Sequence, residues 1–105
     1  MVTTTTVDEL EIARQRGCRI IDVREPHEYR AGHVPHAQLL PVDQVPLHLG
    51  SLGRRRPVYL ICETGNRSAR VAEYLHTHGF DAYTVAGGTA AWRSAGRPVT
   101  TRDVA

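Results

Sequence analysis

The sequence contains no lysine, very few cysteines and no long hydrophobic run. All thirteen basic residues are arginines, scattered apart from the triplet Arg54-Arg55-Arg56, so no continuous basic face of the kind that binds nucleic acid is predicted. We interpret the triplet as a solvated loop before a strand, with a partner-docking patch as the alternative. No apolar stretch is long enough to span a bilayer. We therefore predict neither a nucleic-acid partner nor a membrane partner.

Cys18 and Cys62 are the only cysteines, and they stand far apart without metal-ligand spacing. Two such thiols, in a chain whose first residues have neither a charged leader nor an apolar segment, suggest a reducing compartment. We predict a cytoplasmic protein. The six histidines are not spaced as ligand pairs, so we predict no metal site. His33 is interpreted as a structural hydrogen-bonding residue, and Cys18 as a small buried residue at the start of a strand.

The length of 105 residues and the ordinary proportions of hydrophobic (41%) and charged (23%) residues predict one soluble globular domain, spanning residues 1–105. Its ends, residues 1–5 and 99–105, are the candidates for mobile segments. The threonine run near the N-terminus also suits a short edge strand, because β-branched residues favour strands.

Strands and helices are predicted to alternate along the chain. Apolar runs predict strands at 18–23, 58–61 and 82–85, with a brief strand near 38–40. Helical spacing and stop signals predict helices at 7–16, 25–30, 68–77 and 89–94, with a short one near 43–49. This alternation predicts an α/β domain with a central parallel sheet, in which ligands bind beyond the carboxyl ends of the strands. Cys62 directly follows one such end.

Cys62 begins a turn of sequence Cys62-Glu63-Thr64-Gly65-Asn66-Arg67 between a predicted strand and a predicted helix. A free thiol has a pKa of about 8.5, and loop amides, a helix N-terminus and the Arg67 guanidinium would each favour its thiolate form. A buried structural thiol is the alternative. We interpret Cys62 as a catalytic nucleophile.

Three stretches, in this order and spacing, together resemble the rhodanese family. They are Ile21-Asp22-Val23-Arg24-Glu25 with its continuation to Ala37, the loop Cys62–Arg67, and Val85-Ala86-Gly87-Gly88 followed by Trp92. The resemblance implies a three-layer fold with a mostly parallel five-stranded sheet flanked by helices. It also implies sulfur transfer without a metal or organic cofactor. Cys62 would take a sulfane sulfur from a small-molecule donor such as thiosulfate, and its persulfide would pass that sulfur to cyanide or a thiol.

The resemblance extends to the substrate-binding residues. Backbone amides of Glu63, Thr64, Gly65, Asn66 and Arg67 would hold the anionic persulfide, and Arg67 would help to seat an anionic donor. The hydroxyls of Thr64 and Ser68 would each donate a hydrogen bond, although Ser68 equally suits a helix start.

Two alternatives to a stand-alone sulfurtransferase remain. One is a sulfur carrier or adaptor that exchanges sulfur only with a partner protein, such as a member of a sulfur relay. The other is a phosphatase-like hydrolase, but related phosphatase loops are Cys-x5-Arg. The shorter Cys-x4-Arg spacing from Cys62 to Arg67 suits a sulfur atom better than a tetrahedral oxyanion.

Glu63 places a carboxylate beside the nucleophile, where an inward orientation would oppose thiolate formation. We predict that it points to solvent at the rim of the loop. An inward orientation would favour a neutral persulfide or a partner protein as the donor.

The flanking motifs are assigned to architecture. Arg24 and Glu28 are predicted to form an ion pair across one turn, and Asp22 to bond loop amides or an arginine. Gly87 and Gly88 are interpreted as positions that need unusual dihedrals or close packing. Trp92 is interpreted as a core or rim residue.

Overall fold

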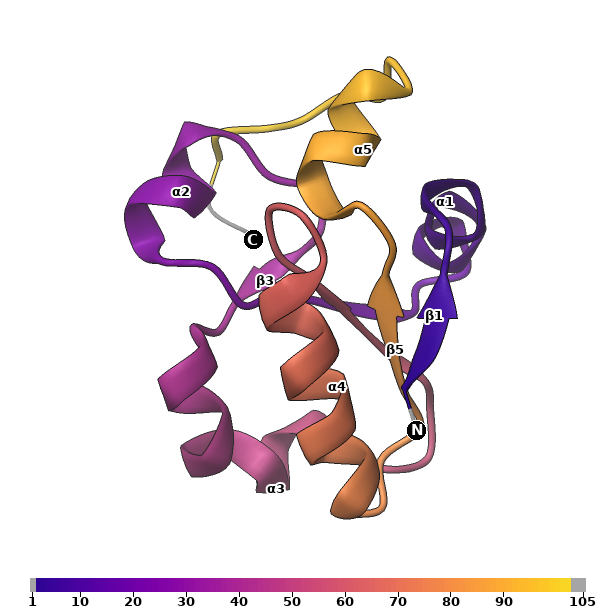
Figure 1. Ribbon diagram of the computed structural model, residues 1–105, viewed down its shortest axis with the longest axis vertical. Helices are drawn as coiled ribbons and strands as arrows, with labels where there is room; N and C mark the ends of the chain where they lie inside the picture. The colour runs from indigo at the N-terminus through magenta and orange to yellow at the C-terminus, as the bar shows by residue number, and fades with distance from the viewer. Residues whose placement is uncertain (1, 103–105) are drawn as a thin grey trace.

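A five-stranded parallel sheet forms the centre of the protein in a computed structural model that describes residues 2–102 (Figure 1). Its strands are β1 (Thr3–Thr5), β2 (Arg19–Asp22), β3 (Gln38–Leu39), β4 (Val58–Ile61) and β5 (Ala82–Val85). They lie in the order β1-β5-β4-β2-β3, and all four pairings are parallel. The predicted α/β class with a parallel sheet is confirmed.

The helices are α1 (Val7–Gln15), α2 (Pro26–Ala31), α3 (Leu49–Leu52), α4 (Asn66–Thr77) and α5 (Gly88–Ser94), with a 3-10 helix η1 (Val42–His48) before α3. None of these helices is long and apolar enough to cross a membrane, as judged over residues 2–102.

Helices cover both faces of the sheet because successive side chains of a strand point to opposite faces. On one face, Ile21 and Leu60 pack in a core with residues of η1, α3 and α4. On the other face, Ile20 and Ile61 pack with Leu10 of α1 and with α5. These four aliphatic strand residues are at most 2% exposed, and burying each contributes about 1.5–3 kcal/mol. The three layers of the predicted fold follow from this alternation.

Helix α1 begins with the capping box that its sequence predicts. The Thr6 hydroxyl accepts the Glu9 N–H at 3.1 Å, and the Glu9 carboxylate accepts the Thr6 N–H at 2.9 Å. Such a cap contributes about 1 kcal/mol. The preceding threonines form edge strand β1, which pairs with β5.

Two predictions about the chain's course need qualification. The helix expected near 43–49 is instead a 3-10 helix that continues into α3. Pro46 lies inside it, and in an α-helix its ring would clash with the carbonyl four residues earlier. At the C-terminal end, Thr100 pairs with His33 through two backbone hydrogen bonds of 2.9 Å. The rest of the end predicted to be mobile includes residues 103–105, which lie outside the described part of the chain.

The carboxyl ends of β2, β4 and β5 meet at one edge of the sheet. Three segments that are distant in sequence therefore come together: Val23–Arg24 after β2, the Cys62 loop after β4, and Gly87–Gly88 after β5. Backbone hydrogen bonds join these segments. The Thr89 N–H donates to the Cys62 carbonyl at 2.9 Å, and the Val23 N–H donates to the Ile61 carbonyl at 3.0 Å.

Candidate active site

The Cys62 sulfur lies against the first turn of α4, and the residue is only 1% exposed. The Gly65 N–H donates to Sγ at 3.1 Å and the Ser68 N–H at 3.3 Å. Both amides belong to the beginning of α4, where N–H groups lack intrahelical partners and carry the positive end of the helix dipole. This arrangement stabilises negative charge on the sulfur.

Burial raises the pKa of the Cys62 thiol and is the largest single influence on it. Hydrogen bonds from the Ser68 hydroxyl and amide, and from the amides of Gly65 and Thr64, together outweigh that effect. The pKa of Cys62 is therefore lower than that of an ordinary thiol, and a thiolate is the reactive form.

The hydroxyl groups of Ser68 and Thr84 link the Cys62 sulfur to strand β5. The Ser68 Oγ lies 3.4 Å from the Cys62 Sγ and 2.8 Å from the Thr84 Oγ1, and it also donates to the Gly65 carbonyl at 3.2 Å. When the Thr84 hydroxyl donates to Ser68, the single Ser68 proton can point either to the Gly65 carbonyl or to a thiolate. Ser68 is thus both a first-turn helix residue and a partner of the sulfur.

Glycines allow the loop and the β5–α5 turn to approach each other closely. Gly65 adopts a φ of +105° immediately before α4, and Gly88 adopts +59° as the first residue of α5. A Cβ on Gly88 would lie 2.5 Å from the Cys62 carbonyl oxygen and 2.6 Å from that of Glu63. The prediction that Gly87 and Gly88 need unusual dihedrals or close packing is confirmed, since Gly87 also has a positive φ of +75°.

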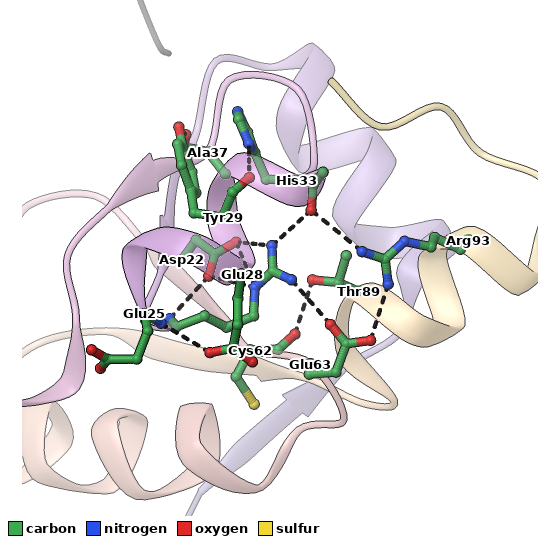
Figure 2. Close-up of polar contacts among 12 residues, drawn as sticks. Asp22, Glu25, Glu28, Tyr29, His33, Ala37, Cys62, Glu63, Thr89 and Arg93 are labelled. Carbon is green, nitrogen blue, oxygen red and sulfur yellow. Dashed lines mark hydrogen bonds and ion pairs between the residues drawn. The ribbon is translucent and has the colours of Figure 1, made fainter. Parts of the chain in front are cut away.

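The Glu63 carboxylate points away from the Cys62 sulfur, as Figure 2 shows. Arg24 and Arg93 each bind it at 3.0 Å, and the side chain is 36% exposed. The predicted outward orientation agrees with this placement. The carboxylate does not contact solvent alone, however, because it also pairs with two arginines. The negative charge beside the nucleophile is thereby compensated.

The predicted ion pair between Arg24 and Glu28 is wrong. Arg24 is 1% exposed and binds Asp22 through both Nε and Nη2, at 3.0 and 2.9 Å, while it also donates to the Gly32 carbonyl. Because Arg24 lies outside α2, which begins at Pro26, the spacing of one helical turn does not apply to it. Asp22 pairs with an arginine, which is one of its two predicted roles.

Glu28 instead binds Arg67 through two parallel hydrogen bonds of 2.8 and 2.9 Å. This pair lowers the pKa of Glu28 to about 2 and raises that of Arg67. The Arg67 guanidinium, predicted to act on the sulfur and on an anionic donor, therefore shares its charge with a carboxylate.

The other predicted residues are placed as follows. Thr64 and Asn66 are exposed on the outside of the loop, where Asn66 begins α4. Trp92 is fully buried, and His33 bonds the Tyr29 carbonyl at 2.7 Å, as predicted for a core and a structural residue.

Cys18 is partly exposed and precedes β2, so its predicted burial is wrong. Over residues 2–102, no group of three or more histidine, cysteine, aspartate or glutamate side chains is arranged to hold a metal ion.

Sequence reasoning missed the partners that lie far away along the chain. They are Thr84, which bonds Ser68; Thr89, whose hydroxyl donates to the Cys62 carbonyl at 2.9 Å; and Arg93, which binds Glu63. No local spacing indicates any of these three contacts.

Comparison with known proteins agrees with this arrangement. The family model described as Rhodanese-like domain matches residues 6–95. Thiosulfate sulfurtransferase GlpE of Pseudomonas putida is 34% identical over 86 residues, which are 81% of this chain and 78% of that protein. A rhodanese-related protein from Thermoplasma volcanium superposes with a TM-score of 0.88 at 28% identity, covering 95% of this chain and 99% of that one. A rhodanese-like domain protein from Staphylococcus aureus gives a TM-score of 0.79 at 39% identity, covering 88% and 91% of the two chains. With the family match spanning most of its length, the chain belongs to the rhodanese-like domain family.

Proposed function

We propose that this protein is a sulfurtransferase that carries sulfur as a persulfide on Cys62. The observation that supports this most directly is the hydrogen bonding of the Cys62 sulfur, which receives the Gly65 and Ser68 N–H groups at 3.1 and 3.3 Å. A sulfur atom in such a position is an activated nucleophile, and the same donors suit the anionic persulfide that it would become. The resemblance to thiosulfate sulfurtransferases adds the class of reaction.

The proposed reaction has two balanced steps. The Cys62 thiolate attacks the outer sulfur of thiosulfate, the S–S bond of thiosulfate breaks, and sulfite leaves with the bonding electron pair. An acceptor nucleophile, cyanide or a thiolate, then attacks the terminal sulfur of the persulfide. Thiocyanate or a new persulfide departs, and the Cys62 thiolate is regenerated. Neither step requires an external oxidant or reductant.

The experiment is a thiosulfate and cyanide assay that measures thiocyanate. Wild-type protein and Cys18→Ser should turn over at similar rates, because Cys18 lies outside the loop. Cys62→Ser should reduce turnover to background. Equal rates in wild type and Cys62→Ser would refute the proposal.

A protein-bound persulfide is a second candidate for the donor. It is favoured by the bidentate bond between Arg67 and Glu28, which reduces the positive charge available to attract the thiosulfate dianion. In this case the isolated protein would gain the mass of one sulfur on Cys62 when mixed with a persulfidated protein or low-molecular-weight persulfide. It would still produce little thiocyanate from thiosulfate. Mass spectrometry of wild type and Cys62→Ser would distinguish this carrier from the stand-alone enzyme.

A further inference from the structure

An open groove of about 1080 Å³ lies outside the Cys62 loop, and its lining includes no residue from 62 to 68. The segment before β2, including Cys18, and the segment before β4, including Leu52 and Pro57, form much of its wall. These are the amino ends of the strands, whereas Cys62 follows the carboxyl end of β4. Parallel α/β sheets bind substrates at the carboxyl ends, so the groove is not an extension of the candidate active site.

Six of the thirteen arginines line this groove, and we call it the basic groove. They are Arg14, Arg19, Arg54, Arg55, Arg56 and Arg102. No aspartate or glutamate occurs among the lining residues that the structure describes. The lining side chains therefore carry a formal charge of +6 in a chain whose net charge is +2, which leaves −4 for all other residues. Positive charge is concentrated on one part of the molecule.

Within residues 2–102, most of these guanidinium groups form no ion pair with an acidic side chain. Arg14 pairs with Glu11 at 2.8 Å, but among residues 2–102 no ion pair involves the other five arginines of the groove. Arg19 donates to the Ser51 carbonyl at 2.6 Å, and Arg54 donates to the His78 carbonyl at 2.9 Å. By contrast, arginines near the Cys62 loop are neutralised, as for Arg24 and Arg67. An uncompensated cluster of like charges favours an anionic ligand.

The shape of the groove distinguishes among anions. Its volume exceeds that of most small-molecule pockets, about 300–1,000 Å³, and it is open to solvent. The C-terminal end of α1, through Arg14 and Gly17, contributes to its wall, and that end carries the negative pole of the helix dipole. A compact phosphate would gain no backbone cradle there. Ligand charge must instead be bound by separate guanidinium groups along the groove.

Aromatic residues distinguish nucleic acid from protein as the ligand. Surfaces that bind single-stranded nucleic acid stack bases on aromatic side chains. The described lining of the basic groove contains no phenylalanine, tyrosine or tryptophan, but it includes the half-buried apolar side chains of Pro35 and Pro57. An acidic polypeptide, with carboxylates for the arginines and aliphatic groups for these positions, matches both features.

We propose that the basic groove is a docking surface for an acidic segment of a partner protein, bound at the opposite end of β4 from Cys62. The proposal gives the arginine triplet the role of a partner-docking patch, the alternative to the solvated loop predicted from the sequence. Binding there leaves the Cys62 loop open. The proposal does not depend on the reaction that Cys62 performs.

The test uses octaglutamate, blocked at both ends, as the probe, with the full-length protein at low salt. The wild-type protein should bind octaglutamate, and the affinity should fall as salt is raised. Arg55→Glu/Arg56→Glu should weaken binding by about tenfold or more, because two attractions become repulsions. The matched control is Arg30→Glu/Arg70→Glu, which changes net charge equally at two exposed positions outside the groove. The control should weaken binding far less.

Cys18 provides a second readout, because it borders the groove and is partly exposed. In a Cys62→Ser background, octaglutamate should slow the reaction of Cys18 with N-ethylmaleimide in proportion to the occupied fraction of the protein. Unchanged Cys18 reactivity at saturating peptide would overturn the proposal. So would equal loss of affinity in the two charge-reversal pairs. Tighter binding of a single-stranded oligonucleotide of equal charge would overturn it in favour of nucleic acid.

Discussion

Replacing Ser68 with alanine tests the origin of the lowered pKa of Cys62. The Ser68 hydroxyl is the first of the groups that lower this pKa, and the substitution removes it while it leaves the amides of Gly65 and Ser68 in place. We expect the pKa of Cys62 to rise in Ser68→Ala, and thiolate-dependent alkylation to slow.

The magnitude follows from the strength of a hydrogen bond to a charged group, about 1.5–3 kcal/mol. The lower limit applies here, because Oγ and Sγ are 3.4 Å apart and the Gly65 carbonyl competes for the same proton at 3.2 Å. A loss of about 1.4 kcal/mol corresponds to a factor of ten in an equilibrium constant. At pH values below the inflection, Ser68→Ala should therefore react about tenfold more slowly.

The assay is iodoacetamide alkylation in a Cys18→Ser background, with the rate measured by mass spectrometry across the pH range. Thr84→Val should shift the inflection upward by less, because Ser68 keeps its own proton. The matched control is Ser51→Ala, an exposed serine whose hydroxyl donates to the His48 carbonyl at 2.9 Å, and it should leave the profile unchanged. An unshifted inflection in Ser68→Ala would mean that the Ser68 hydroxyl does not lower the pKa of Cys62.

Three further predictions concern stability. Gly88→Ala should destabilise the protein by about 3 kcal/mol in urea unfolding, because its Cβ would lie 2.5 Å from a carbonyl oxygen of the Cys62 loop. The control Gly96→Ala should cost about 1 kcal/mol, because Gly96 also has a positive φ but a Cβ there would meet nothing within 4 Å. Arg24→Met should cost about 3–5 kcal/mol, because it leaves a buried carboxylate unpaired, but Arg93→Met, at a side chain that is 40% exposed, should cost under about 1 kcal/mol. The pKa of Glu28 is lowered from 4.5 to about 2 by its arginine partner, so the stability from this pair is present above pH 4.5 and is lost as the pH falls toward 2. Glu28→Gln should therefore be less stable than wild type at neutral pH, and the difference should vanish near pH 2.

Each of these predictions has an outcome that would contradict it. Equal unfolding free energies for the two glycine variants would mean that Gly88 does not pack against the loop. Equal costs for Arg24→Met and Arg93→Met would mean that burial of the first arginine is unimportant. A constant difference between Glu28→Gln and wild type from neutral pH to pH 2 would mean that Glu28 is not ionised in an ion pair.

Much of the fold and the position of the candidate nucleophile were predictable from the sequence, because the relevant signals are local. Short apolar runs marked β2, β4 and β5, and the capping box marked the start of α1. Cys62 could be placed at the end of a strand and before a helix for the same reason. The η1 helix was less predictable, since Pro46 permits a 3-10 helix that the apolar pattern does not distinguish from an α-helix.

The pairing of charged side chains depends on the folded structure and not on spacing along the chain. Arg24 binds Glu63 and Arg67 binds Glu28, and each pair is 39 positions apart in the sequence, where spacing rules carry no information. The sequence shows the triplet Arg54-Arg55-Arg56, but not that Arg14, Arg19 and Arg102 join it in the basic groove. The sequence by itself therefore determined the strands, the helices and the loop that carries Cys62. The folding of parallel strands into one sheet determined its electrostatic surroundings, because charge interactions depend on distance in space and on burial.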